Sequence, residues 1–423
     1  MRPGSVEELT STIEQAARDR VPVIAVGGQR ATSDVSRPAE RGIAIALDRV
    51  PLDPSRWRVR GDLLGTEPRI PRGHGLTRVH AAASLRDVLA ALEREGRTLA
   101  AVPADDLATV AGAVATGDHG SGMIAGPLAD SVAAIELVTA SGGTPSGPRV
   151  RHVRIEPRNG IGIARGDLLQ DDDLFRSAVV SMGCAGAVTA LTLVTVPAFA
   201  LEERRELVPW SALRDGLVAR ARAEDFLELT LLPDARGADL CLVRSRSHTD
   251  AADSQLDGGG GAQGGRALLE AAAARRIHGP SSRVLRTRIG PTGASSTEMV
   301  VDLERAVAAI DATLSCVRGG ALPIAVRFTR ASRAYLAMQY GRESCAIEVS
   351  VAEGESPSAL MRFERMLLDP RIGGRPHWGR SHTVAGGFVD HYPKAARWRA
   401  SLRRLGAGSV FESAFSRRLS IRA

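Results

Sequence analysis

The segment TVAGAVATGDHGSG, residues 109–122, gathers small side chains around one aspartate and one histidine. Glycine and alanine remove side-chain bulk, so such a backbone can approach a ligand closely and turn its N–H groups toward an anion. The composition therefore favours a cradle for a phosphate or a cofactor. A tight buried turn between two elements would have the same composition, and one glycine-rich segment does not separate the two readings.

Two further glycine-rich segments have the same character, each beside a strand-like run. They are AVGGQRATSD at 25–34 and MGCAGAVTALTL at 182–193. Three backbone cradles in one domain could hold an extended ligand that has a pyrophosphate and two ring systems. The sequence lacks a GxGxxG fingerprint between a strand and a helix, which disfavours a nicotinamide-type enzyme, and it lacks GxSxG, HExxH and Walker motifs.

Composition sets limits on the class of protein. The chain has 423 residues, 44% hydrophobic and 24% charged, which is ordinary for a globular protein of two or three domains. It has no apolar run of membrane-spanning length and begins without a secretory signal. We therefore expect a cytoplasmic protein that acts on a small molecule, without membrane or nucleic-acid partners; the sequence leaves its oligomeric state open.

The cysteines and the basic residues indicate neither a metal site nor nucleic-acid binding. Cys184, Cys241, Cys316 and Cys345 lie far apart without metal-ligand spacing, so we expect free thiols and no metal site. The formal charge is +7, yet Lys394 is the sole lysine, which indicates compositional drift toward arginine. Basic runs interleaved with aromatics are absent, and this argues against nucleic-acid binding.

Helix-like and strand-like segments interleave in the first half of the chain and predict an α/β or α+β arrangement. Ser84 is a plausible cap for the helix SLRDVLAALEREG. After about residue 200, longer strand-like runs begin, and DGGGGAQGGR at 257–266 predicts a flexible surface loop. We therefore place a domain boundary near residue 200.

The chain resembles a known family in segments that follow the family's order. It is similar to the FAD-linked oxidases of the vanillyl-alcohol oxidase fold, in the aldonolactone and alditol oxidase branch. The resemblance rests on RPGSVEEL, PVIAVGGQRATSD, TVAGAVATGDHGSG, DLFRSAVVSMGCAGAVTALTLVTVPAF, PIAVRFTRASRAYLAMQYGRESCAI and GGRPHWGRSHT.

The resemblance implies a two-lobed α+β fold. A PCMH-type FAD-binding domain would cover residues 1–200, and a substrate domain with an antiparallel sheet flanked by helices would cover 201–385. A final segment, 386–423, would return to the FAD-binding domain.

The resemblance also implies which residues contact FAD. For His119, tying the loop together is as plausible as direct contact. The expected cofactor residues are Gly27, Gly28, Gln29, Arg30, Ala31, Thr109, Gly112, Thr116, Gly117, His119, Gly120, Gly122, Val188 and Thr189.

Three positions depart from the family pattern. Arg30 stands where the family carries the histidine that bonds covalently to the flavin, and a guanidinium cannot form that bond, so we expect noncovalent FAD. Arg30 could still pair with a phosphate or shield the flavin edge. Ala325 replaces a glutamate two residues before Arg327, and Arg380 replaces a lysine.

Four residues are the candidates for catalysis. Arg327 would bind substrate and polarise its hydroxyl, and Arg380 would stabilise negative charge. His382 or Glu348 would accept the hydroxyl proton. The structural alternatives are a surface ion pair for Arg327, packing for His382 and a solvated strand end for Glu348.

These residues predict FAD-dependent oxidation of a carbinol C–H by hydride transfer to flavin N5. The substrate would be a sugar, alditol, lactone, cyclitol or related secondary-metabolite alcohol, and the electron acceptor stays open. Because three active-site positions differ from the family pattern, the alternative is a flavoprotein that catalyses an isomerisation, elimination or cyclisation, or that uses FAD structurally. A protein that binds no flavin is a further possibility.

Overall fold

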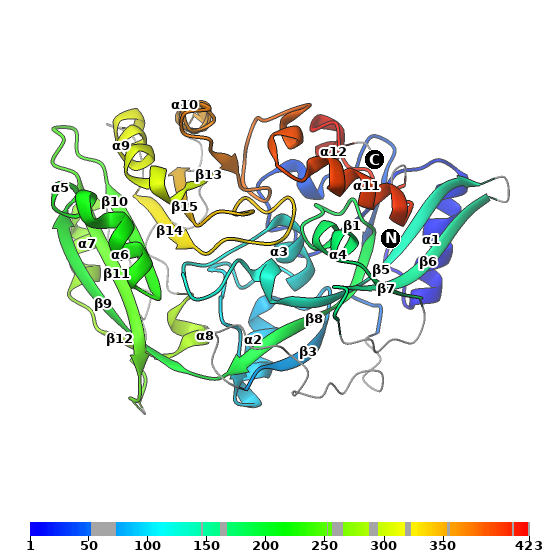
Figure 1. The fold of residues 1–423 in the computed structure, drawn as a ribbon, viewed down its shortest axis with the longest axis horizontal. Coiled ribbons are helices and arrows are strands. Elements are labelled where there is room, and N and C mark those ends of the chain that lie inside the picture. Colours follow the sequence, from blue (N-terminus) through cyan, green and yellow to red (C-terminus); the bar gives the residue numbers. More distant parts are fainter. Residues whose placement is uncertain are drawn as a thin grey trace.

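The computed structural model describes most of the chain. It leaves out residues 52–72, 145–146, 161–166, 252, 256–264, 287–294, 318–322, 353–355, 408–409 and 422–423. The glycine-rich loop expected at 257–266 thus lies outside the described residues, apart from Gly265 and Arg266, which begin a helix. Two lobes lie side by side in Figure 1, and both chain termini belong to the same lobe.

The first lobe is built on a mixed sheet and a small parallel pair. Its sheet has the order β3-β8-β5-β6-β7, with β4 paired to β8, and β1 pairs with β2. The elements are α1 (Val6–Arg18), β1 (Val23–Val26), η1 (Asp34–Ser36), β2 (Ile43–Ala46), β3 (Gly75–His80), α2 (Leu85–Arg94), β4 (Arg97–Thr98), α3 (Val110–Thr116), η3 (Leu128–Ser131), β5 (Val132–Thr144), β6 (Gly147–Glu156), β7 (Asp167–Gln170), α4 (Asp172–Val179) and β8 (Ala187–Pro197).

Local chemistry explains where these helices start. Ser84 caps α2, because its hydroxyl accepts a hydrogen bond from the N–H of Asp87, as the sequence predicts. Thr109 caps α3 in the same way, and Gly117 ends that helix in the left-handed conformation at φ 73°. The glycine-rich segment at 109–122 is therefore a short capped helix followed by a turn.

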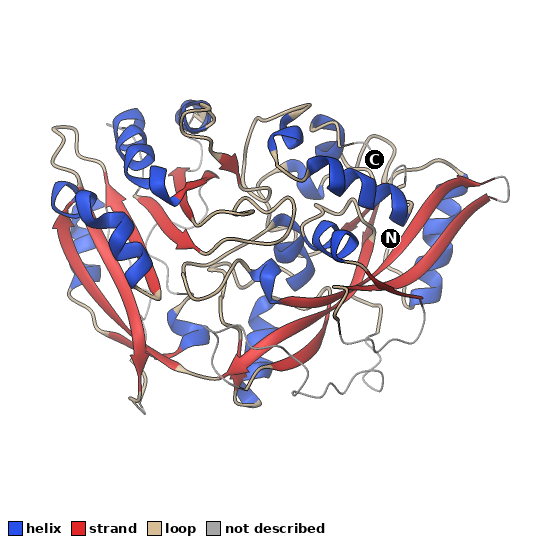
Figure 2. Cartoon of the chain, viewed as in Figure 1, coloured by secondary structure: helices blue, strands red, loops and turns tan. Residues whose placement is uncertain are grey.

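The second lobe is an eight-stranded antiparallel sheet with the order β12-β9-β11-β10-β14-β15-β13-β16. The helices of this lobe flank the sheet in Figure 2. The elements are β9 (Ala200–Pro209), α5 (Trp210–Leu213), η4 (Arg214–Gly216), α6 (Leu217–Ala223), β10 (Phe226–Leu232), β11 (Leu240–Thr249), α7 (Gly265–Ala273), β12 (Ile277–Pro280), α8 (Ser281–Val284), β13 (Ser295–Asp302), η5 (Leu303–Arg305), α9 (Ala306–Val317), β14 (Ile324–Thr329), β15 (Ser344–Val351), α10 (Ser358–Leu367) and β16 (Arg375–Pro376).

The two faces of the eight-stranded sheet differ in chemistry. In β14, Val326 and Phe328 join an apolar cluster that includes Leu314 of α9 and Phe363 of α10. Side chains alternate along a strand, so Arg327 projects from the opposite face. That face carries a row of buried arginines and glutamates, beside a small apolar cluster that Leu242 forms with Leu269 of α7.

The last part of the chain returns to the first lobe. It consists of η6 (Phe388–His391), α11 (Ala395–Leu405) and α12 (Ala414–Arg418), which lie beside α4 and β1 in Figure 1. The indole N–H of Trp398 in α11 donates to the carbonyl of Ser177 in α4 at 3.1 Å. Within the described residues, no helix is both long and apolar enough to cross a bilayer.

Candidate functional site

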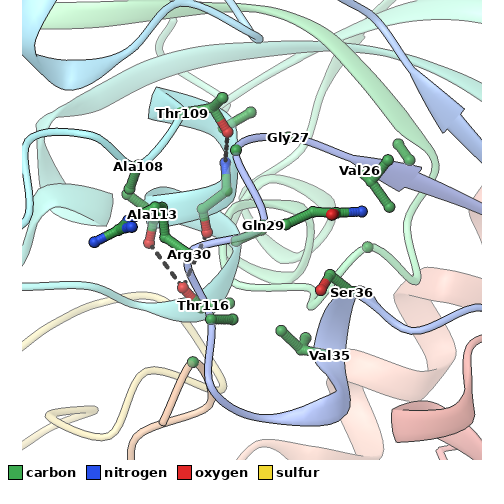
Figure 3. A pocket seen from close by; sticks show the side chains of 18 of the residues that line it. Val26, Gly27, Gln29, Arg30, Val35, Ser36, Ala108, Thr109, Ala113 and Thr116 are labelled. Carbon is green, nitrogen blue, oxygen red and sulfur yellow. Dashed lines mark hydrogen bonds between the residues drawn. The ribbon is translucent and has the colours of Figure 1, made fainter. Parts of the chain in front are cut away.

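A cavity opens in the first lobe where the glycine-rich segments meet. Its walls are the loop after β1, helix α3, the turn before β8 and the segment around residues 377–380 (Figure 3). The hollow contains about 1040 Å³ of space, a volume that includes solvent at its open mouth. Segments distant in sequence thus share one site. The predicted residues that line it are Gly27, Gly28, Gln29, Arg30, Ala31, Thr109, Gly112, Thr116, Val188 and Arg380.

Close backbone approach explains the glycines in the loop after β1. A Cβ built on Gly27 would lie 2.1 Å from Oγ1 of Thr109, so a side chain here would push the loop away from α3. Gln29 follows in the left-handed region at φ 49°, which is uncommon for a residue with a side chain. The loop is thus bent tightly against the cap of α3.

Gly120 and Gly122 have a different role from the expected cofactor contact. A Cβ on Gly120 would lie 2.3 Å from the carbonyl oxygen of Val102, and one on Gly122 would lie 3.0 Å from the ring of Phe226. The N–H of Gly122 donates to the carbonyl of Phe328 at 2.7 Å. Gly120 thus lets the turn pack against the first lobe and Gly122 lets it pack against the second, so the structural reading fits this half of the segment.

Three other expected cofactor residues are not among the described residues that line the cavity. Gly117 ends α3 and faces the side chain of Met338. Thr189 accepts or donates a hydrogen bond with His152 at 3.0 Å and lines a separate hollow near α1. His119 is buried, and its Nε2 lies 2.8 Å from a carboxylate oxygen of Glu298.

Arg327 is surrounded by carboxylates on the charged face of the sheet. Its Nη1 lies 2.9 Å from Glu298 and 3.0 Å from Glu348, and its Nε lies 3.5 Å from Glu228. Glu298 and Glu348 are direct partners in the β13–β15 register, a pairing of like charges that would be unfavourable alone. Arg327 relieves this repulsion by bridging them.

The predicted role of Arg327 in substrate binding is not supported by this position. Arg327 is not among the described residues that line the cavity. Burial alone would lower its pKa, but the charges of Glu348, Glu228 and Glu298 outweigh burial and raise it. Its charge is therefore matched within the protein, and its role in the structure is to hold three buried strands together.

Replacing Arg327 with methionine should destabilise the fold by about 3–5 kcal/mol, because three buried carboxylates would lose their shared cation. Urea unfolding of the two proteins measures the difference. Arg327→Lys, which keeps the charge, should lose less stability than Arg327→Met. Equal unfolding midpoints for wild type and Arg327→Met would contradict the bridging role.

Glu348 and Arg380 form the next link of the same network. Nε of Arg380 lies 3.2 Å from Oε1 of Glu348, while Oε2 of Glu348 faces Arg327. Both carboxylate oxygens thus face guanidinium groups and are occupied within the protein. Glu348 is not among the described residues that line the cavity, whereas Arg380 is. The predicted base role of Glu348 is not supported by this geometry.

His382 also lies away from the cavity lining. Its ring packs edge-on against Trp378 and Phe415, and its Nδ1 lies 3.4 Å from Nη1 of Arg418. Burial first, and then the charge of Arg418, lower the pKa of His382 to about 3. A ring with this pKa binds a proton only weakly at neutral pH, so the packing alternative fits His382 better than the role of a base.

Two residues at the cavity were missed as candidates, although both lie in segments that the sequence singled out. Asp118 follows Gly117 in TVAGAVATGDHGSG, and His377 opens HWGR. Both line the cavity together with Arg380. Oδ1 of Asp118 lies 3.7 Å from Nε2 of His377. The place of Asp118 directly after the helix-ending Gly117 is the sequence signal for it.

The electrostatics of Asp118 favour its ionised form. Burial alone would raise its pKa, but hydrogen bonding to His377 and the charge of Arg380 outweigh burial and lower the pKa below its usual value. The N–H of His119 also donates to Oδ1 of Asp118 at 3.0 Å. The cavity wall thus carries a carboxylate, an imidazole and a guanidinium at one end.

Comparisons with known proteins agree with this geometry. Residues 1–144 match an FAD binding domain, and residues 293–419 match the D-arabinono-1,4-lactone oxidase family. Each lobe of the chain is thus similar to a part of the FAD-linked oxidases. The chain is 26% identical to an L-gulono-1,4-lactone dehydrogenase of Mycobacterium tuberculosis, over 99% of this chain and 95% of the relative.

Two further matches extend over nearly the whole chain. An alditol oxidase of a Streptomyces species is 28% identical to this chain, over 99% of its length and 94% of that protein. The crystal structure of cholesterol oxidase from Brevibacterium sterolicum superposes with a TM-score of 0.72 at 12% identity, covering 98% of this chain and 92% of the other. The two-lobed α+β fold is thereby confirmed, and FAD is the cofactor.

The cavity fits FAD on the evidence of its own residues. Backbone from three glycine-rich segments lines it, and such backbone can approach a ligand closely. Gly112 of α3 lines the cavity, and a Cβ there would lie 2.9 Å from Oγ1 of Thr109. Because glycine has no Cβ, a ligand can approach the backbone of α3 at this point. Arg30 adds a cation, paired at 3.4 Å with Asp105. A long, thin, anionic dinucleotide suits such a lining.

Proposed function

We propose that this protein removes a hydride and a proton from a carbinol group of an alditol, an aldonolactone or a closely related sugar alcohol. The observation that carries the proposal is the meeting of Asp118, His377 and Arg380 at the wall of the glycine-lined cavity. The relatives named for L-gulono-1,4-lactone and alditols support this substrate class. Bound FAD supplies the two-electron acceptor.

The residues of the chain have separate tasks in this proposal. The backbone at Gly27, Gly28 and Gln29, with Thr109 and Gly112 opposite, holds the dinucleotide. Arg380 binds the substrate oxygen and stabilises negative charge near it, because a guanidinium stays protonated throughout.

Asp118 accepts the hydroxyl proton, and His377 orients it. The lowered pKa of Asp118 keeps the carboxylate deprotonated at neutral pH, so the acceptor is ready before substrate binds. His377 is held in turn, because the N–H of Gly379 donates to its Nδ1 at 3.0 Å. That bond directs Nε2 of His377 toward Asp118.

Anaerobic mixing tests the proposed reaction. Xylitol, sorbitol and L-gulono-1,4-lactone should each be mixed with the FAD-loaded protein while the visible absorbance is followed. Bleaching by at least one of them is the expected result. A yellow protein that none of these bleaches, yet that converts one of them without loss of electrons, would favour the isomerisation, elimination or cyclisation alternative.

Acid precipitation should release FAD into the supernatant. Arg30 occupies the position of the linking histidine, and its side chain pairs with Asp105. A guanidinium in an ion pair offers no nucleophilic nitrogen to the flavin ring. The absorbance of supernatant and pellet after precipitation measures the outcome, and yellow colour that stays in the pellet would contradict noncovalent binding.

A further inference from the structure

A compact cluster of buried polar groups lies next to the cavity. His119, Glu298 and His377 are each under 5% exposed. One ligand atom from each lies within 4.8 Å of those of the other two, a spacing that a metal ion could use. The rings of His119 and His377 are 5.7 Å apart. The hydrogen bonds decide whether this cluster suits a metal or a proton.

Those hydrogen bonds argue against a metal. Nδ1 of His377 accepts the N–H of Gly379, so the proton of its ring lies on Nε2 and that nitrogen has no lone pair to offer. Oε2 of Glu298 accepts a hydrogen bond from Arg327 at 2.9 Å. A guanidinium this close opposes a second cation on the same carboxylate. Two remaining donor atoms are too few for a stable metal centre.

His119 shows the opposite preference, because both of its ring nitrogens face oxygen atoms. Nδ1 lies 2.9 Å from the carbonyl oxygen of Gly120, and Nε2 lies 2.8 Å from Oε1 of Glu298. A carbonyl accepts only, so Nδ1 must donate. Nε2 then either donates to an ionised carboxylate or accepts from a protonated one. Arg327 on the other oxygen of Glu298 favours the ionised carboxylate.

We propose that His119 is a permanent imidazolium, held by Glu298, and that it serves as a positioning residue which places a fixed positive charge behind the cavity wall. The direction of its pKa agrees: burial alone would lower the pKa, but the charge of Glu298 and the hydrogen bond to it raise it. The pKa of Glu298 falls well below its usual value, since the charge and hydrogen bond of His119 outweigh burial.

Charged and titratable groups surround His119 on several elements. They are Glu298 of β13, Arg327 of β14, His377 after β16 and Asp118 on its own loop. Glu298 is the neighbour that favours protonation most, and Arg327 opposes it. The charge of His119 lowers the pKa of Asp118 and would favour electron-rich, reduced FAD in the adjoining cavity.

The protonation state can be read without activity, by nitrogen NMR of histidine-labelled apoprotein. One of the nine histidines should keep imidazolium shifts at both ring nitrogens up to pH 8, and His119→Gln should remove that resonance. His391→Gln, at an exposed ring, should leave it in place. In Glu298→Gln the resonance should change to the neutral form at pH 8, which a merely structural histidine would not show.

A neutral His119 at pH 7 in the wild type would overturn the proposal, because Glu298 would then carry the proton. Should His119→Gln fail to fold, Glu298→Gln and the wild type decide the same point. Zinc added to the wild-type apoprotein should leave the resonance unchanged, and its displacement by zinc would indicate a metal site instead.

The effect on the cofactor rests on FAD occupying the proposed cavity and is measured separately. His119→Gln should lower the reduction potential of bound FAD by about 30 mV, which corresponds to a tenfold weaker preference for the reduced form in a two-electron couple. An unchanged potential beside a persistent imidazolium signal would overturn the link to the cofactor. Loss of FAD binding in the wild type would instead contradict the proposed function.

Discussion

Asp118→Asn should slow the bleaching of bound FAD by substrate about 10²–10⁴-fold, the usual contribution of a general base. Asparagine keeps the shape of the side chain, and its amide oxygen can still accept the N–H of His119 that Asp118 accepts at 3.0 Å. It cannot accept the substrate proton. FAD should stay bound, and rapid anaerobic mixing at saturating substrate measures the rate.

Asp105→Asn is the matched control. Asp105 also lines the cavity, but its carboxylate pairs with Arg30. We expect it to change the bleaching rate less than about threefold once FAD is saturating, since it lacks a role in proton transfer. Equal losses in the two variants, or an Asp118→Asn rate near wild type, would remove Asp118 from the role of base.

Gly112→Leu should weaken FAD binding by roughly 100-fold or more while leaving the fold intact. The new side chain would rise from α3 into the hollow that Gly112 lines. The leucine side chain and FAD would then compete for the same volume, so FAD could bind only by displacing the side chain. Leucine forms helices better than glycine, which offsets the small shift that its Cβ, 2.9 Å from Oγ1 of the cap Thr109, would impose on the start of α3. Fluorescence titration of the apoprotein with FAD measures the affinity.

Gly216→Leu provides the comparison for this change. A Cβ on Gly216 meets no atom within 4 Å, and this residue belongs to the second lobe, outside the described lining of the cavity. It should bind FAD as the wild type does. Should Gly112→Leu also bind FAD at wild-type affinity, the cofactor cannot lie along α3.

Sequence patterns predicted the local elements and the segments that line the cavity better than the partners of the candidate catalytic side chains. The cap at Ser84 is confirmed, since it depends on residues three apart. The three glycine-rich segments together supply most of the residues that line the cavity, because small residues beside strands restrict the backbone in recognisable ways. The two-residue alternation of side chains along β14 also predicts that Arg327 projects from the face opposite the apolar cluster, as it does in the structure.

The partners of these residues could not be read from the sequence. Arg327 meets Glu298 across 29 positions and Glu348 across 21, through strands whose order in the sheet is not sequential. His382 lies near HWGR, yet the chain turns its ring toward Arg418 and away from the cavity. Gly120 and Gly122 look like cradle residues, but the space they leave is filled by Val102 and by Phe226, respectively.

The location of FAD is the claim on which the other assignments depend, and amide hydrogen exchange of the apoprotein with and without FAD tests it most directly. We predict slower exchange on FAD binding in both the loop at 24–31 and helix α3, because these segments form opposite walls of the cavity. Slower exchange confined to other segments, such as those around His152 and Thr189, would contradict the account.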